Sequence, residues 1–418
     1  MSAPQAPVRA SSYWILYASL LTVGVGNSML QPLLPPLGRE LGLRDSSLGW
    51  IFSLSALFWV FASPFWGRRS DTVGRKPIIA LGMGAYALSM ALFATVVMIG
   101  QAGWLPAAFI FVGLMLARAI FGAVGSASSP ASQAYVADRS TPAERTEKIA
   151  ALTATFALGA TVGPALCALL AGRFGLVFPI VFTAIAAAVV AWLTMRFLPE
   201  PEKPEAPAER ASWADSWTLA SDRRLAPFLI YGLGISIVTG TLQQTYTLYL
   251  MDELGVRGEA AAEQASAGFM VGALALLATQ MALIPRLKWR SRTLMTVGGA
   301  IVAVGVVTQI LAASLGGLIV SQFMQGIGFG LARPGFAGGA SMSVTPREQG
   351  AAAGLVVAVN GAGFVISPIT GGVAYDLVHR LAPLTISLVL LVAMALFAWR
   401  SRRLRDVESQ APPTIDPT

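Results

Sequence analysis

The chain has 418 residues, of which 55% are hydrophobic and only 12% are charged. Soluble domains carry about a quarter charged residues, so this composition excludes an ordinary soluble globular protein. The formal net charge of +8 would suit a nucleic-acid partner, but the basic residues gather at the ends of apolar runs, as a membrane protein requires. One cysteine, Cys167, and one histidine, His379, leave no material for an internal disulfide, a cysteine metal cluster or a histidine-based catalytic centre. We therefore expect no metal, no cofactor, no nucleic-acid partner and no enzyme activity.

A helix that spans a membrane needs about 20 apolar residues. The first such run is followed by three prolines within Pro32–Pro36 rather than by a small-residue cleavage site, so we expect it to remain as a spanning helix. The sequence predicts an all-α membrane protein with twelve spans in two six-helix bundles, over residues 13–35, 47–66, 78–99, 105–136, 149–172, 177–198, 226–250, 264–285, 293–313, 316–341, 351–374 and 382–399.

Most of the 29 Lys and Arg residues fall on one side if the N-terminus is placed inside. Because cytoplasmic loops are enriched in Lys and Arg, this bias predicts that both termini are cytoplasmic. Only a few basic residues remain on the outer side or inside a helix. The outer ones are Arg39, Arg44, Arg173, Arg257 and Arg380, and those inside helices are Arg118 and Arg333. The scarcity of lysine fits a bacterial protein, so we expect a multi-pass protein of the bacterial inner membrane.

A polar stretch rich in Pro and Glu separates the first six predicted helices from the last six. Pro and Glu at this density resist packing and are typical of a linker. Trp213 and Trp217 are four residues apart, which favours a short amphipathic helix on the membrane surface. The predicted organisation is a first bundle at 1–198, a cytoplasmic linker at 199–224, a second bundle at 225–405 and a disordered tail at 406–418.

The two halves repeat. The sequence Thr141-Pro142-x-Glu144 recurs as Thr345-Pro346-x-Glu348. The same separation along the sequence also pairs glycines with glycines and prolines with prolines. A shared membrane composition would repeat apolar residues in general, so it does not explain these matches. The pairs are Gly122 with Gly326, Pro130 with Pro334, Gly159 with Gly363, and Pro164 with Pro368. Duplicated six-helix halves are typical of secondary transporters.

A short basic turn with one acid, Gly67-Arg-Arg-Ser-Asp71-Thr-Val-Gly74-Arg75-Lys76-Pro, lies between the second and third predicted helices. Its spacing resembles the loop signature of the major facilitator superfamily. The resemblance implies that Asp71 lies near the start of a helix in the other half, where the helix dipole stabilises a carboxylate, and that this contact closes the cytoplasmic side. We interpret five of these residues as a conformational switch: Gly67, Asp71, Gly74, Arg75 and Lys76. The alternative is an ordinary positive-inside loop.

Glycines and a proline recur in the fifth and eleventh predicted helices. Glycines let helices approach closely in lipid, and proline removes a backbone hydrogen bond and bends a helix. The fifth helix resembles the family's antiporter signature in part, because Ala150 and Cys167 stand where the signature has glycines. We interpret Gly159, Gly163, Pro164, Gly363 and Pro368 as a flexible seam, against the alternative of generic small-residue packing.

Arg118 lies within an apolar helix, where a charge costs at least ~2.5 kcal/mol unless it finds a partner or water. The pattern Arg118-x3-Gly122-x3-Ser126 resembles the family's fourth-helix motif, whose Arg is linked to proton movement. Two readings stay open: a role in proton coupling and substrate binding, or an arginine tied to a carbonyl or an amide of a neighbouring helix. Asp and Glu occur only near helix ends, which weakens the case for a cationic substrate and leaves the proton carrier unassigned.

Uncharged polar residues inside the predicted helices are further candidates for substrate binding. In the fold that the resemblance implies, most of them fall on the helices that line a central cavity. Each of them is equally able to serve as a hydrogen-bonding contact between helices. Together with Arg118, the predicted substrate-binding residues are Asn27, Gln31, Gln243, Gln244, Tyr246, Gln322, Gln325 and Asn360.

The resemblance extends over the whole chain and, within the superfamily, is to the twelve-helix drug:proton antiporter group. It implies a secondary active transporter that works by alternating access and exports a small drug-like, amphipathic or anionic molecule against a proton gradient, as in multidrug resistance. The alternative is an importer or facilitator of an organic anion or lipid-like metabolite without proton antiport. Its expected partners are the substrate, protons and membrane lipids, and we expect a monomer.

Overall fold

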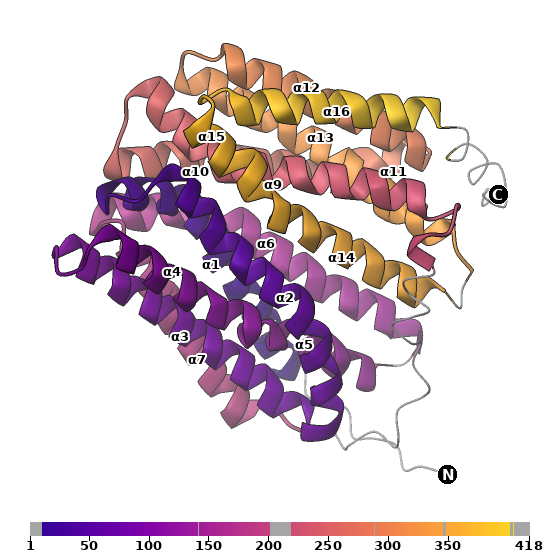
Figure 1. The fold of residues 1–418 in the computed structure, drawn as a ribbon. Coiled ribbons are helices and arrows are strands. Elements are labelled where there is room, and N and C mark those ends of the chain that lie inside the picture. The colour runs from indigo at the N-terminus through magenta and orange to yellow at the C-terminus, as the bar shows by residue number, and fades with distance from the viewer. Residues whose placement is uncertain are drawn as a thin grey trace, which may run out of the picture. The chain divides into compact units, whose positions relative to one another are not determined.

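The computed structural model describes residues 11–140, 142–200, 219–287, 289–345, 348–401 and 404 (Figure 1). Within these ranges all regular elements are helices, and 12 of them are long and apolar enough to cross a membrane. The expected all-α fold with twelve spans is therefore confirmed. The predicted helix around Trp213 and Trp217, most of the linker and the tail from residue 406 lie outside the described residues.

The chain divides into two compact units, and unit 1 comprises Met1–Ala208 together with Arg257–Ser266. Its first helix packs on the fifth and sixth spans, and its third packs on the fourth and sixth. The elements are α1 (Ser11–Glu40), α2 (Asp45–Val73), α3 (Arg75–Gln101), α4 (Ala107–Ala123), η1 (Gly125–Ala127), α5 (Ser128–Asp138), α6 (Pro142–Phe174) and α7 (Phe178–Phe197). The fourth span is α4, η1 and α5 in succession.

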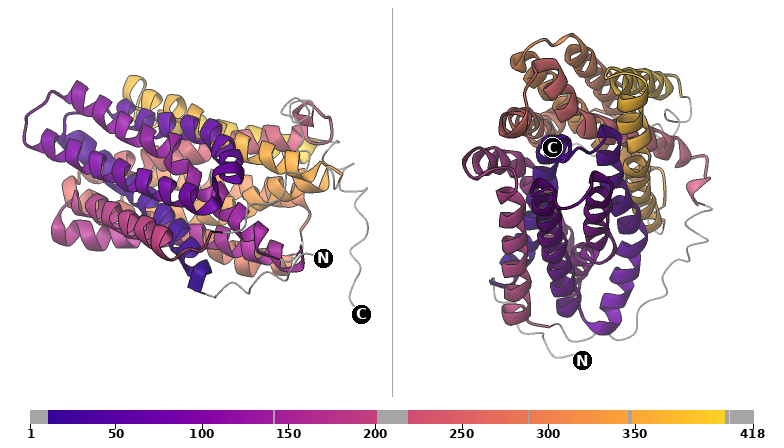
Figure 2. Two further views of the ribbon diagram at one scale, coloured as in Figure 1. Left: turned by 90° about the horizontal axis from the view of Figure 1, so that it is seen from below. Right: turned by 60° about the vertical axis from the view of Figure 1, so that its left-hand side comes forward.

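Unit 2 comprises Glu209–Val256 and Ala267–Thr418. Within it α9 packs against α13, α14 and α16, and α12 packs against α13 and α16. Figure 1 shows α12 beside α16. The views of Figure 2 show the helices of each unit running alongside one another. The elements are α9 (Ala226–Leu254), α10 (Gly258–Ala278), whose residues up to Ser266 belong to unit 1, η2 (Thr279–Leu283), α11 (Ile284–Leu287), α12 (Ser291–Leu311), α13 (Leu315–Met342), α14 (Gln349–Pro368), η3 (Ile369–Val373), α15 (Ala374–Leu377) and α16 (Ala382–Arg400).

The helices extend beyond most of the predicted spans, most clearly at the basic turn. There α2 continues through Val73 and α3 begins at Arg75, so the expected loop is reduced to Gly74. Gly74 has φ +117°, a conformation that side chains other than glycine rarely adopt. Apolar counting ends a span where polar residues begin, whereas the backbone hydrogen bonds of the helix continue. Asp71 consequently lies in the last turn of α2.

Large apolar side chains remain on the outside of the bundle. Phe61 is 70% exposed, Trp104 76% and Met281 78%. A monomeric soluble protein rarely exposes so much apolar surface, whereas hydrocarbon contacts such side chains favourably. The distribution fits helices that face lipid.

Glycines that pair in the sequence repeat occupy helix crossings in both units. A Cβ added to Gly122 of α4 would lie 2.2 Å from the Ser55 carbonyl oxygen of α2, and one added to Gly326 of α13 would lie 2.2 Å from the Gly272 carbonyl oxygen of α10. In the same way, Gly159 of α6 lies against the backbone of α1, and Gly363 of α14 lies against Ser236 of α9. Equivalent small residues therefore permit equivalent close approaches of backbones in lipid.

The first prediction concerns this packing. Gly122→Ala places a methyl group against backbone that cannot move away, so it should destabilise unit 1 by about 1–3 kcal/mol, the usual cost of overpacking. Gly84→Ala in α3 is the matched control, because nothing lies within 4 Å of a Cβ added there. Thermal unfolding of the purified protein in detergent should show a lower midpoint for the first variant only. Equal midpoints would contradict close packing of α2 and α4.

Candidate functional site

Unit 1 has a buried charge within the fourth span at Arg118, which is 3% exposed. Its Nη2 donates a hydrogen bond of 2.9 Å to Oδ1 of Asn27 on α1. Its Nε and Nη1 are buried and have no hydrogen-bond partner among the described residues. The structure thus brings together two predicted site residues and leaves two donor atoms of the guanidinium unsatisfied.

Aromatic rings surround this guanidinium. Its carbon Cζ lies 4.6 Å from the ring centroid of Phe121 and 5.8 Å from that of Phe52, distances typical of cation–π contacts. Tyr86 packs on Phe121 with centroids 4.7 Å apart, and its hydroxyl is buried without a hydrogen-bond partner. Trp59 extends the cluster, 5.3 Å from Phe121. Sequence reasoning identified Arg118 and Asn27 in this cluster but not Phe52, Tyr86 or Phe121, because aromatic residues are common in spans and give no signal by themselves.

In unit 2, the predicted site residues Gln244 and Asn360 form hydrogen bonds to a neighbouring helix. Gln244 donates from Nε2 to Oγ of Ser367 at 2.8 Å, and Ser236 donates to Oδ1 of Asn360 at 2.8 Å. Thr241 and Thr370 share a further bond of 2.5 Å. These contacts form a polar ladder between α9 and the α14–η3 segment. Gln244 and Asn360 are therefore helix-pairing residues in this conformation, and their predicted role in substrate binding remains a prediction.

Another buried polar pair joins α12 and α13. Gln325 donates from Nε2 to Oε1 of Gln309 at 2.8 Å, and both side chains are at most 2% exposed. Tyr246 on α9 is fully buried with an unpartnered hydroxyl, and Gln322 is 8% exposed. Gln309 was not among the predicted residues, although a glutamine inside an apolar run was a visible signal. Gln31 and Gln243, on α1 and α9, are half-buried.

At the end of unit 1 where α2 meets α3, three polar side chains contact Arg75. Its guanidinium lies 2.6 Å from Asp71 and 2.8 Å from Asp138, and it donates to Oγ of Ser70 at 2.5 Å. Arg75 is 5% exposed and the Asp71 side chain 11%, so water screens this ion pair little. Two predicted switch residues are thus in direct contact, while Ser70 and Asp138 were missed by sequence reasoning.

Glu200 also belongs to this end of unit 1. Its carboxylate accepts hydrogen bonds from the backbone N–H groups of Arg75 at 2.8 Å and Lys76 at 3.1 Å. A carboxylate there satisfies orphan donors of α3 and is favoured by the helix dipole. A Cβ at Gly74 would lie 2.6 Å from this carboxylate, which is a second reason for glycine at that position. The sequence had assigned Glu200 to the linker, because it stands between two prolines.

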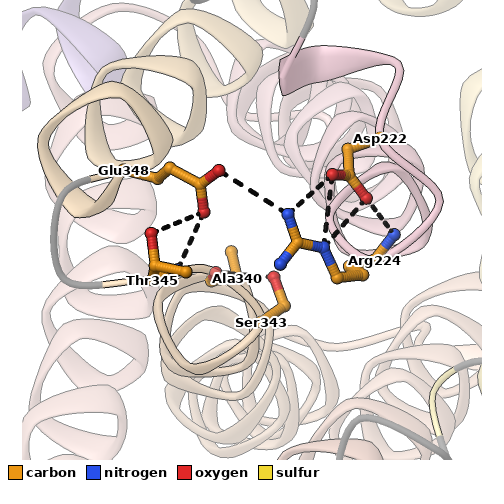
Figure 3. Close-up of polar contacts among 6 residues, drawn as sticks. All are labelled: Asp222, Arg224, Ala340, Ser343, Thr345 and Glu348. Atoms are coloured by element: carbon orange, nitrogen blue, oxygen red, sulfur yellow. Dashed lines mark hydrogen bonds and ion pairs between the residues drawn. The ribbon is translucent and has the colours of Figure 1, made fainter.

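The other end of the linker is fastened in unit 2 (Figure 3). Arg224 lies 2.8 Å from Asp222 and 3.6 Å from Glu348, and Glu348 accepts two bonds of 2.9 Å from the backbone N–H and hydroxyl of Thr345. The Thr345 donors, with a smaller contribution from Arg224, hold the pKa of Glu348 below its ordinary value. The side-chain and backbone hydrogen bonds from Arg224 similarly lower the pKa of Asp222. Both carboxylates therefore stay ionised at neutral pH and keep Arg224 paired.

The Gly-Pro segments take different forms in the two units. In α6 a Cβ at Gly163 would lie 1.9 Å from Oγ of Ser28, so α1 and α6 pack closely around Gly159 and Gly163. Pro164 is accommodated inside the helix. In unit 2 Pro368 ends α14, and the π-helical turn η3 follows it directly. Such turns replace the regular bonding of an α-helix and often mark functional positions.

No group of three or more His, Cys, Asp or Glu side chains suited to a metal ion occurs among the residues that the structure describes. The candidate sites are the Arg118 guanidinium with its aromatic shell, a set of buried amides and two charged clusters at helix ends.

Known proteins resemble this chain throughout its length. Multidrug resistance protein 2 of Bacillus subtilis (strain 168) is 24% identical over 402 residues, which cover 93% of this chain and 95% of that protein. Quinolone resistance protein NorA of Staphylococcus aureus (strain MSSA476) is 23% identical over 373 residues, which cover 89% of this chain and 91% of NorA.

Solved structures share the fold. A bacterial homolog of the human lysosomal transporter Spinster, in an inward-facing and occupied conformation, has a TM-score of 0.77 at 15% identity over 95% of this chain and 97% of its own. The human organic anion transporter MFSD10 (TETRAN) has a TM-score of 0.65 at 19% identity over 94% of this chain and 100% of its own. The model of the Major Facilitator Superfamily matches residues 16–307 and 284–417. With this match along nearly all of its length, the chain belongs to the Major Facilitator Superfamily, a family of membrane transporters.

Proposed function

We propose that this protein is a secondary active transporter that exports a small organic molecule across the bacterial inner membrane by alternating access, coupled to the proton gradient. Family membership and the names of its relatives, which describe resistance to drugs and quinolones, support export. The observation that carries the proposal is the Arg118 cluster. A buried ionisable group in a span is costly and marks a substrate or proton pathway by default.

In this proposal the amides and Tyr246 complete the substrate contacts. Several of them form helix-to-helix bonds in this conformation, and exchanging such a bond for a ligand bond during the transport cycle changes the free energy little. We assign substrate binding to Arg118, Asn27, Gln31, Gln243, Gln244, Tyr246, Gln322, Gln325 and Asn360, and proton coupling to Arg118.

We assign the conformational switch to the Arg75 cluster. The ion pair with Asp71 is nearly dry, so breaking it requires either water entry or a new partner for each charge. Such a contact favours two discrete arrangements over a continuum. The glycines of α6 and α14 supply surfaces on which helices can slide at small cost.

The second prediction tests transport and its coupling. Proteoliposomes loaded with a fluorescent substrate should release it faster when a pH gradient, acidic on the receiving side, is imposed. Adding a protonophore should return the rate to that of the undriven protein. Release that is independent of both treatments would contradict proton coupling, and a rate equal to protein-free liposomes would contradict transport.

The third prediction concerns the switch. Asp71→Asn removes the charge that pairs with Arg75, so transport should slow by about tenfold, corresponding to about 1.4 kcal/mol, with an unchanged unfolding temperature because Asp138 still holds Arg75. Glu144→Gln is the matched control, since it breaks an exposed pair with Lys148. Transport rates in liposomes provide the measurement. A wild-type rate for Asp71→Asn would rule out its role in the switch.

The fourth prediction concerns orientation, which we propose has both termini in the cytoplasm. Cys167 is the single cysteine and is buried, so Cys167→Ala provides a cysteine-free background. In that background, Ala102→Cys between α3 and α4 should react with an impermeant maleimide added to intact cells. Arg69→Cys, at the end of α2, should react only after permeabilisation. The reverse labelling pattern would show the opposite topology and would contradict cytoplasmic termini.

A further inference from the structure

The charged side chains of the described spans that lie more than two turns from a span end are basic: Arg118 in the fourth span and Arg333 in the tenth. Each acidic residue of the twelve described spans lies within the first or last two turns of its span, near a water interface. Among the ion pairs of the described residues, none involves Arg118. Its one hydrogen-bond partner, Asn27, is a neutral amide.

A guanidinium has five N–H donors and no acceptor. Asn27 takes one of them, and the buried Nε and Nη1 have no acceptor within the described part of unit 1. The hydroxyl of Tyr86, also buried and unpartnered, lies near the same arginine and against Gly26, the residue before Asn27. Nε and Nη1 of Arg118 and the Tyr86 hydroxyl are therefore three buried polar groups without a hydrogen-bond partner among the described residues.

The aromatic shell defines what else the site can hold. Phe121 and Phe52 contact the guanidinium, and cation–π contacts hold a cation in place without neutralising its charge. The shell reaches the surface of unit 1 at Asn27, Phe52 and Trp59, which are half-buried. A ligand with a flat apolar body would stack against these rings while its polar group faces Arg118.

We propose that the molecule transported by this protein is an amphipathic aromatic anion, a carboxylate or sulfonate, whose acid group binds Arg118 with Tyr86 as an additional donor. The guanidinium matches such oxyanions through paired N–H groups, whereas a lipophilic cation would meet an uncompensated positive charge. This inference rests on the proposed transport function and specifies its substrate class.

The test uses two dyes with the same xanthene body and opposite charge, fluorescein and rhodamine 6G, and benzoate as the smallest aromatic carboxylate. Binding to the purified full-length protein in nanodiscs is measured by fluorescence anisotropy for the dyes and by displacement for benzoate. Flux of both dyes is measured in proteoliposomes. We expect the protein to bind and transport fluorescein, to bind benzoate, and to bind rhodamine 6G at least tenfold more weakly.

Variants locate the site. Arg118→Gln should weaken fluorescein binding at least tenfold, Arg118→Lys should retain part of it because the charge remains, and Tyr86→Phe should weaken it about threefold. Arg196→Gln, which removes an exposed charge near the end of α7, is the matched control and should bind as the wild type does. If thermal unfolding shows that Arg118→Gln does not fold, two other comparisons still test the anion site. These are the binding of fluorescein to Tyr86→Phe and to the wild type, and the binding of the two dyes to the wild type.

The outcomes separate the two proposals. Fluorescein binding that requires Arg118, without flux of either dye, would overturn the transport function and leave the anion site. Rhodamine 6G flux that survives Arg118→Gln, without fluorescein binding, would overturn the anion site and leave transport. Failure of both fluorescein and benzoate to bind would show that Arg118 has a structural role only, and it would overturn the anion site.

Discussion

Hydrocarbon offers no hydrogen-bond partner to a buried polar group, and this constraint governs each part of the structure. It confines the backbone to helices, because only helices satisfy their own N–H and C=O groups within a span. It also makes the fourth span costly, since Arg118 has one amide partner and two unsatisfied nitrogens among the residues that the structure describes. Elsewhere many buried hydroxyls bond a carbonyl of their own helix, as Thr183 does with Pro179, and some amides pair across helices, as Gln325 does with Gln309. In the proposed function, a bound ligand supplies the acceptors that the Arg118 guanidinium lacks.

The rest of each unit is built so that helices can be close without large side chains between them. Gly122 and Gly326 touch the backbone of the neighbouring span at the same point of the repeat. Because such contacts depend on shape rather than on strong directional bonds, they allow small displacements of one helix against another. The charged clusters at the ends of the linker, around Glu200 and Arg224, fix helix ends instead. Each unit thus combines two features. Charged clusters fix helix ends at the side that is cytoplasmic in the proposed orientation, and small residues allow close helix contacts in the membrane.

The sequence predicted the spans because mean hydropathy over 20 residues is a strong signal, and it predicted the repeat because glycine and proline positions are distinctive. It failed at the helix ends, where α2 continues through Ser70 and Asp71 although the apolar run has stopped. It also missed Glu200, since a capping contact with α3 across the chain leaves no local pattern. For Asn27 and Gln244 it left binding and helix pairing open. Distances were needed to show that Asn27 faces Arg118 and that Gln244 faces Ser367.

The anion proposal also accounts for the location of the acids. Moving one elementary charge across a membrane changes its energy by about 2.3 kcal/mol per 100 mV. With an anion bound, the Arg118 site is neutral, so its passage to the outer side does not oppose the inside-negative potential. The empty site carries a positive charge, and the potential favours its return towards the cytoplasm. An exporter of cations faces the opposite field and needs a carboxylate to exchange the cation for a proton. In this proposal the membrane potential adds to the pH gradient as a driving force, so no acid at mid-span has to balance the charge of the substrate.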